Sequence, residues 1–195
     1  MSDAGEVEAH SEAEAAALIA QGAVLVRNAH QMRLRLPHDT SDDPEIHSFS
    51  PDANPPAAWI DALPAFLAAY PPDHPDHLPG GAGLIESYLV PYTAGAKLGT
   101  LICSASGFAV RDGYPYAGIL VVDRPGEGAW VCDIWRDPDP SYAGAGTRLL
   151  RWSASRLDDF TSVGLAVTVG NDRARRTYER VGFTIESTAW RLTMP

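Results

Sequence analysis

The most constraining feature of this sequence is an ordered pattern in its C-terminal half that predicts a strand, a glycine-containing loop, a helix, a second strand and a second helix. Residues 130–135 form an apolar run that leads through two prolines into the loop 142–147. Residues 162–169 alternate strictly between apolar and polar or small side chains, which predicts a strand. Because a crossover helix joins these two strands, we expect them to run parallel. The apolar face of that helix consists of Leu149, Leu150, Ser153, Ala154 and Leu157.

The second helix of the pattern has start and stop signals of its own. Asn171 can cap its first turn, and Gly182 stands where a left-handed C-cap is expected. Residues 184–193 alternate loosely and predict a last strand. One face of the helix carries four residues at helical spacing, namely Asn171, Ala174, Tyr178 and Val181.

Upstream of this pattern the sequence predicts an antiparallel meander of about four strands. Its apolar and β-branched runs are separated by glycine-containing turns. The expected strands are 84–92, 98–104, 118–122 and 130–135.

Residues 1–80 differ in composition from residues 81–195. The first segment holds 13 acidic residues and three arginines, together with ten of the 16 prolines, whereas the second has 12 charges of each sign. We therefore predict one domain in which 81–195 is the core and 1–80 is an acidic, proline-rich elaboration of it. In this elaboration Asn54 is expected to cap a helix that Pro64 breaks or kinks.

Other elements of the elaboration have clear local signals. Ser11 with Glu14 is a capping-box signature and predicts a helix that Gly22 ends. Residues 23–27 suggest a short strand. The polar, proline-punctuated stretch 38–54 predicts a loop.

Composition also excludes several classes of protein. A net charge of −10 argues against a nucleic-acid partner, since phosphates need a basic surface, and the acidic elaboration favours a cationic partner or is simply a solvated face. No apolar run is long enough to span a bilayer and the N-terminus does not resemble a secretion signal, so we expect a cytoplasmic protein without membrane contact. Cys103 and Cys132 are read as free thiols. His74 and His77 lie in a proline-containing stretch without a third ligand cluster, so no metal is expected.

Gly144 and Gly146 precede the first helix of the pattern. The first amides of a helix lack acceptors and carry partial positive charge, and glycines allow an anion to approach them. The alternatives are a phosphate cradle and a plain tight turn. No Lys-Ser/Thr follows, which excludes a P-loop, and the context fits a dinucleotide-binding fingerprint poorly.

The two halves of the pattern together resemble the GNAT superfamily of acyl-CoA-dependent N-acyltransferases. Residues 171–183 match its N-x-x-A-x-x-x-Y-x-x-x-G-F signature at every named position, and Pro138 followed by Gly144-Ala145-Gly146 resembles its acyl-CoA loop. The close match covers residues 130–183. The resemblance implies an α/β (α+β) fold with a mixed, mostly antiparallel sheet, a splayed parallel strand pair and flanking helices.

The resemblance also implies a cofactor site for acetyl-CoA, used as co-substrate. Backbone amides of the loop would hold the pyrophosphate, the main chain of the preceding strand would pair with the pantetheine arm and supply an oxyanion donor, and Asn171 would contact the cofactor or serve only as a cap. The loop residues are Tyr142, Ala143, Gly144, Ala145, Gly146 and Thr147, and the strand residues are Ile134, Trp135 and Arg136. Ser141, Tyr142 and Ala143 depart from the family pattern by leaving the phosphate site without a basic side chain.

Tyr178 is the expected catalytic acid. A phenol with a pKa near 10 can protonate or stabilise a departing thiolate whose thiol has a pKa of about 8.5. Its alternative is a packed aromatic residue on an amphipathic helix. Asp133 and Glu86 are candidate bases for removing the amine proton, and each could instead be an exposed strand carboxylate.

The sequence thus predicts an N-acetyltransferase that transfers an acetyl group to a primary amine by direct attack. The acceptor, a small molecule or a peptide, is left open, and so is the choice between a monomer and a homodimer. The competing interpretations are a non-catalytic acyl-CoA-binding or regulatory module, and a structural domain that binds no acyl-CoA.

Overall fold

One mixed sheet organises the chain in this computed structural model, which describes residues 5–37, 39, 41–50 and 56–195. The described residues form nine strands in the order β1-β9-β2-β8-β7-β6-β5-β3, with β4 paired to β6. The strands are β1 (Glu6–Ala9), β2 (Val24–Arg35), β3 (Ile46–Ser48), β4 (Thr100–Leu101), β5 (Gly107–Arg111), β6 (Tyr114–Arg124), β7 (Gly128–Arg136), β8 (Ser162–Thr168) and β9 (Thr184–Thr193). The α-helices are α1 (Glu12–Ala20), α2 (Pro56–Ala69), α3 (Val90–Thr93), α4 (Ala145–Ala154) and α5 (Asp172–Val181). Shorter helical turns are η1 (Gly81–Gly83), η2 (Ile85–Leu89), η3 (Cys103–Ala105) and η4 (Pro140–Tyr142).

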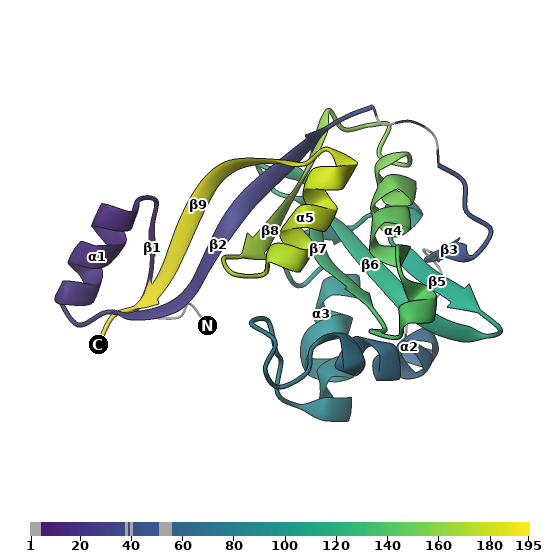
Figure 1. Cartoon of the computed structure of the whole chain (residues 1–195), viewed down its shortest axis with the longest axis horizontal. Coiled ribbons are helices and arrows are strands. Elements are labelled where there is room, and N and C mark those ends of the chain that lie inside the picture. Colours follow the sequence, from purple (N-terminus) through teal and green to yellow (C-terminus); the bar gives the residue numbers. More distant parts are fainter. Residues whose placement is uncertain (1–4, 38, 40, 51–55) are drawn as a thin grey trace.

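Helices cover both faces of the sheet. Because successive side chains of a strand point to opposite faces, Ile119 and Leu120 of β6 belong to different cores. Ile119 lies in a cluster with Leu149 of α4, whereas Leu120 lies in a cluster with Phe66 of α2. Figure 1 shows α4 and α5 side by side, and α2 with α3 lower in the same view.

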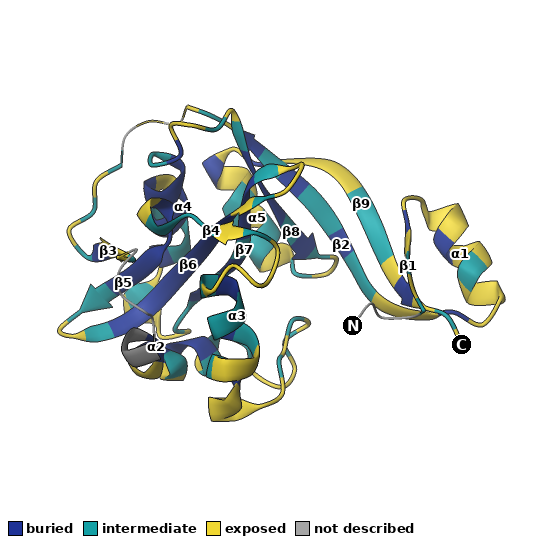
Figure 2. Ribbon diagram, turned by 180° about the vertical axis from the view of Figure 1, so that it is seen from behind, coloured by how far each residue is buried: buried dark blue, intermediate teal, exposed yellow. Residues whose placement is uncertain are grey.

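The outer ends of β2 and β9 extend beyond this body as an arm, with β1 and α1 at its tip (Figure 1). A small separate core of Ala9, Ala15, Ala23 and Leu192 holds the tip together. Figure 2 shows how exposed the arm is. Three successive apolar residues of β2, Val24, Leu25 and Val26, are 45–66% exposed.

The C-terminal half agrees with the sequence expectations. The helix α4 buries the predicted face, β7 and β8 pair in parallel, and β9 spans the predicted residues 184–193. The mixed α/β sheet with one parallel pair is therefore confirmed. The Asn171 side chain caps α5 by accepting from the Ala174 amide at 3.2 Å, and Gly182 ends it with φ of 114°. The antiparallel meander is β5–β6–β7, of which the sequence missed β5.

The predicted strand at 84–92 is wrong, because these residues form η2 and α3. A short apolar run does not distinguish a strand from a buried helical segment. Pro91 is the second residue of α3, which directly follows η2. The buried side chains Leu84, Leu89 and Tyr92 pack beside α2. The predicted strand at 98–104 shrinks to β4 followed by a 3₁₀ turn.

The N-terminal segment is more regular than its prolines suggest. The helix α2 continues through Pro64, so Pro64 does not break it, and the alternative, a kink, stays a prediction. The cap at Asn54 lies outside the described residues. Ser11 caps α1 as predicted, by accepting from the Glu14 amide at 3.2 Å. The strand expected at 23–27 runs to Arg35 and lies between β9 and β8. The predicted loop 38–54 contains β3. None of the described helices is long and apolar enough to cross a membrane.

Candidate active site

The parallel pairing of β7 and β8 ends in the middle of both strands. The register joins Ala129 to Val163 and continues only to Val131 opposite Leu165, although both strands run further. On its other side β7 has a bulge against β6 between Val131 and Asp133. A bulge inserts an extra residue and bends the strand, so β7 turns away from β8 at Cys132. The separation of these two strands was predicted for this place, and the register confirms it.

The glycine loop ends beside this separation. The amides of Tyr142 and Ala143 donate to the carbonyls of Asp139 and Pro140 at 3.1 Å, so these two are not free to bind an anion. Among the described residues, the amides of Gly144, Ala145, Gly146 and Thr147 have no acceptor. Gly144 has φ of 87°, and a Cβ built on it would meet nothing within 4 Å. The predicted cradle is therefore shorter than expected by two amides, and it has room for a ligand.

No basic side chain of the loop supplements these amides. The Tyr142 ring stacks on Tyr116 at 4.3 Å with an interplanar angle of 11°, which places it on the core. Arg148, in the first turns of α4, is held by the carboxylates of Asp43 and Glu45 at 2.6 Å each. The guanidinium of Arg111, 2.8 Å from Glu45, and then that of Arg148 hold the pKa of Glu45 well below its usual range. The loop residues 142–147 therefore offer backbone amides and no basic side chain, as the departures from the family pattern indicated.

Tyr178 lies on α5, half-buried against the main core and close to Phe183, with ring centroids 6.1 Å apart. Burial raises the pKa of its phenol well above the usual value, and the nearby carboxylates of Asp133 and Asp76 add to that rise. The phenol is therefore protonated at neutral pH, and it faces the charge of Asp133. The structure confirms that Asn171 caps α5, and its contact with a cofactor stays a prediction.

Asp133 follows the bulge in β7 and is 8% exposed. Its Oδ1 accepts a hydrogen bond from the Tyr70 hydroxyl at 2.6 Å. Burial raises the pKa of Asp133 to about 6, against the opposing effect of hydrogen bonds from Tyr70 and Tyr88. A carboxyl with this pKa is mostly ionised at pH 7 and is still basic enough to take a proton.

Glu86, the other candidate base, is not on a strand. It lies in η2 with an exposed side chain. Its neighbour Tyr88 faces inward, where burial raises the phenol pKa and the charge of Asp133 raises it further. The amine of Lys97 lies 4.8 Å from the centre of the Tyr88 ring. The structure thus places Asp133, and not Glu86, among the buried tyrosines.

The strand residues predicted to meet the pantetheine arm have different surroundings. The Trp135 side chain is buried in the aromatic cluster with Phe66 at 5.2 Å, so only its main chain can serve a ligand. The carbonyl of Ile134 accepts from the Tyr70 hydroxyl at 3.2 Å, and a carbonyl has a second lone pair for another donor. Arg136 donates to the carbonyls of Asp137 and Asp139.

His74 and His77 are occupied by the backbone. His74 Nδ1 accepts from the Asp76 amide at 3.0 Å, and His77 Nδ1 lies 2.7 Å from the carbonyl of Tyr70. In the described part of the chain, no group of three or more His, Cys, Asp or Glu side chains could hold a metal ion.

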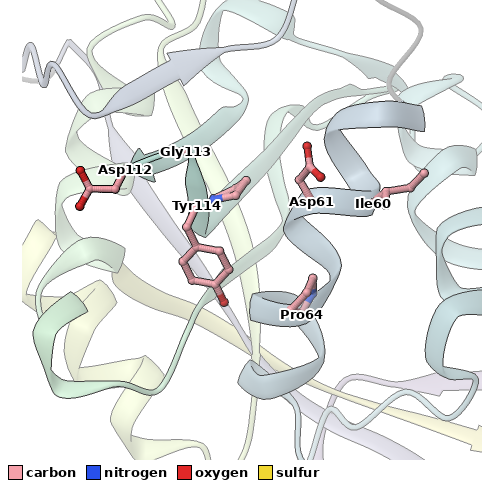
Figure 3. A pocket seen from close by; sticks show the side chains of 7 residues that line it. Ile60, Asp61, Pro64, Asp112, Gly113 and Tyr114 are labelled. Atoms are coloured by element: carbon pink, nitrogen blue, oxygen red, sulfur yellow. The ribbon is translucent and has the colours of Figure 1, made fainter.

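Two open surface pockets lie elsewhere. The one in Figure 3, of about 360 Å³, lies between α2 and the β5–β6 turn and is lined by Asp61, Asp112 and Tyr114 among others. The second, of about 520 Å³, is lined by Arg33, Arg35 and Glu186 among others. Neither of these two pockets is lined by Asp133 or Tyr178.

Sequence reasoning missed Tyr70 and Tyr88, which surround Asp133, and Asp76, which neighbours Tyr178. No local pattern marks them, since they precede Asp133 by 45 residues or more. Tyr88 lies in the run that was wrongly predicted as a strand, and Tyr70 and Asp76 lie in the segment after α2. The one available signal was the gathering of aromatic residues between positions 59 and 92. That clustering indicates a packed core and does not identify the carboxylate it surrounds.

Comparisons with known proteins agree with this architecture. Residues 65–183, more than half of the chain, match the model of the acetyltransferase (GNAT) family. No curated protein matches the chain.

Solved structures of the same family share the fold. A GCN5-related N-acetyltransferase from Sphaerobacter thermophilus superposes with a TM-score of 0.67 at 19% identity, over 96% of this chain and 58% of that one. A GNAT-family putative acetyltransferase from Novosphingobium aromaticivorans superposes with a TM-score of 0.56 at 20% identity, over 97% of this chain and 74% of that one. A GCN5-related N-acetyltransferase from Kribbella flavida superposes with a TM-score of 0.56 at 16% identity, over 97% of this chain and 68% of that one. The chain thus spans less than two thirds of the Sphaerobacter protein. On the family match, the separated β7 and β8, and the glycine loop that starts α4, the chain belongs to the GNAT acetyltransferase family.

Proposed function

We propose that this protein transfers an acetyl group from acetyl-CoA to a primary amine by direct attack of the amine on the thioester. The observation that supports this most is the convergence of two chemical groups beside the β7–β8 separation. Asp133 supplies a buried carboxylate that can take a proton, and Tyr178 supplies a protonated phenol. The amides of residues 144–147 stand free at the start of α4.

The residues fit an acyl-CoA. Free amides at a helix start bind phosphate well, and the open space beside Gly144 leaves room for the approach. Bound there, the thioester supplies the acyl group and a thiolate leaving group. The unpaired end of β7 after Val131 offers main-chain groups to the pantetheine arm, and an amide near Ile134–Arg136 would stabilise the developing oxyanion.

Asp133 and Tyr178 divide the proton transfers. The amine arrives as an ammonium ion, and Asp133 takes one proton from it. The nitrogen lone pair then forms the C–N bond, and the C–S bond breaks. Tyr178 donates its proton to the departing thiolate sulfur. The acylated nitrogen gives its second proton to the Tyr178 phenolate, and Asp133 releases the first proton to solvent, so both groups are restored before the next turnover.

The acceptor is expected to be cationic before it reacts. The Asp133 carboxylate near Tyr178 attracts a cation, whereas Asp76 is already paired with Arg27 and Lys97 already lies over the Tyr88 ring. The acceptor is a small-molecule or peptide amine in this proposal. Measuring KM for the amine against ionic strength tests this expectation. A KM that does not change with ionic strength would contradict a cationic acceptor.

A non-catalytic acyl-CoA-binding module is the second candidate. The absence of a free basic side chain in the loop favours it, since Arg148 is paired with Asp43 and Glu45. It predicts that acetyl-CoA stabilises the fold and that no CoA is released.

The deciding experiment follows thiol release from acetyl-CoA with a panel of amines. The wild type should release CoA with at least one primary amine, and the acetylated amine should appear in the mass spectrum. Stabilisation by acetyl-CoA without thiol release across the panel would favour the binding module. No stabilisation at all would refute both.

A further inference from the structure

The separation of β7 and β8 leaves their outer ends without a ladder between them. β7 keeps its ladder with β6 through Asp133, and β8 keeps its ladder with β2. Asp133 lies beyond the last residue of β7 that pairs with β8, and a backbone ladder does not fix a side chain, so the position of its carboxylate depends on side-chain contacts.

Residues 70–76, the bridging segment, reach both strands. On the β7 side, the Tyr70 hydroxyl lies 2.6 Å from Asp133 Oδ1 and 3.2 Å from the carbonyl oxygen of Ile134. On the β8 side, the Thr168 hydroxyl donates to Asp76 Oδ1 at 2.6 Å. The segment therefore connects the two strands where their own hydrogen bonds stop.

Each end of the bridging segment is held in place by further contacts. The Tyr70 ring packs edge-on between Phe66 and His74, each with a centroid separation of 5.1 Å. The guanidinium of Arg27, on β2, lies 3.4 Å from Asp76 and donates to Thr168 Oγ1 at 3.0 Å.

The two ends are also joined to each other. His74 packs on Tyr70 and accepts from the Asp76 amide at 3.0 Å. A continuous set of contacts thus runs from Thr168 through Asp76, His74 and Tyr70 to Asp133.

We infer that Tyr70 is a positioning residue for the acyl transfer, which holds the Asp133 carboxylate through the bridging segment that spans β7 and β8. This inference rests on the proposed function. Tyr70 does not take the substrate's proton itself, because its hydroxyl already donates to Asp133 and burial keeps that phenol protonated by raising its pKa. Its effect is on the position and basicity of the carboxylate.

The titratable groups around Asp133 come from every element packed against it. Tyr70 follows α2, Tyr88 lies in η2 and Tyr92 in α3. Cys132 is on β7 itself, Asp76 is in the bridging segment and Tyr178 is on α5. The nearby cation, Arg27, is paired with Asp76. Burial raises the pKa of Asp133 to about 6, and the imidazole of His74 also lies in the bridging segment. An acid limb near pH 6 is therefore assigned to Asp133 when Asp133→Asn removes it and His74→Gln retains it.

The test is Tyr70→Phe, which keeps the ring and removes the hydroxyl. A hydrogen bond to a carboxylate favours its charged form, so its loss should move the acid limb of the kcat profile to higher pH by about 1 unit. KM for acetyl-CoA should change less than twofold. The matched control is Tyr114→Phe, which removes a phenol–carboxylate bond of 2.8 Å to Asp137 and should leave the acid limb in place.

Thr168→Val tests the other end of the bridging segment. Because both changes act on Asp133 through one segment, kcat of the double variant should be no lower than that of Tyr70→Phe alone. Thr188→Val loses a 2.8 Å contact between β9 and His30 of β2, which does not involve the bridging segment, so its effect should multiply with that of Tyr70→Phe.

A second measurement works without turnover. The pKa of Asp133, followed by the carboxyl ¹³C signal that Asp133→Asn removes, should rise by about 1 unit in Tyr70→Phe. An active wild type whose acid limb is unmoved by Tyr70→Phe would overturn the inference and leave the proposed function intact. A wild type without thiol release would refute the proposed function, and the carboxyl titration would then show whether Tyr70 holds Asp133: an unchanged pKa would overturn that as well.

Discussion

Gly144→Ala tests the glycine loop most directly. Gly144 has φ of 87°, where an L-residue is strained, and its added Cβ would touch nothing within 4 Å. The cost is therefore conformational, about 1–2 kcal/mol. For a chain of this length each kcal/mol corresponds to about 2–4 °C in Tm. We expect the unliganded variant to melt about 2–8 °C below the wild type.

The same change should also remove the response to acetyl-CoA. A ligand present at 100 times its Kd stabilises a fold by about 2.7 kcal/mol, which is readily seen by differential scanning fluorimetry or calorimetry. If the backbone relaxes away from the left-handed region, the free amides after Gly144 no longer converge. The cofactor-dependent rise in Tm should then shrink or vanish.

Gly113→Ala is the matched control. Gly113 has φ of 79° in the β5–β6 turn, and a Cβ there also meets nothing within 4 Å. Its unliganded Tm should fall by a similar amount, while its response to acetyl-CoA stays that of the wild type. Equal responses in the two variants would refute the cradle at residues 144–147, and an undiminished Tm in unliganded Gly144→Ala would refute the left-handed backbone.

Three further outcomes are expected. Tyr178→Phe should lower kcat about 10²-fold or more, the usual contribution of a general acid, with acetyl-CoA binding retained in the melting assay; an unchanged kcat would leave Tyr178 as a packing residue. Asp133→Asn should lower kcat by a similar factor and abolish the acid limb near pH 6, whereas survival of that limb would assign it to another group. Glu45→Gln should cost about 1 kcal/mol in urea unfolding at pH 7. Because the native pKa of Glu45 is depressed, this difference is present above its unfolded pKa of about 4.3 and should shrink as pH falls below it; a constant difference down to pH 3 would contradict the ion pairs.

Local signals were enough to predict the C-terminal half. The Asn171 cap, the left-handed Gly182 and the alternation from 162 to 168 act between residues at most a few positions apart, and the structure shows all three. Family resemblance added the interpretation of the glycine loop and Tyr178. It did not extend to the bridging segment, because the matched motifs begin after Trp130.

The incorrect predictions at Pro64 and at residues 84–92 share one physical cause. Pro64 removes a helical donor, yet α2 continues because its neighbours Trp59, Ala62 and Phe66 are buried against the sheet. The run 84–92 becomes helical because that form buries Leu84, Leu89 and Tyr92 beside α2. In both places packing between distant segments outweighs the local preference.

The sequence by itself determined which residues start and end the helices of the acyl-CoA motif, because capping and side-chain periodicity are encoded within one or two turns of chain. Only the tertiary structure decided that Asp133 is buried, that Tyr70 from 63 positions earlier donates to it, and that β7 and β8 part just before it. The pKa of a carboxyl depends on the solvent and the donors around it. Those neighbours are brought together by the folding of the whole sheet, so no local pattern could specify them.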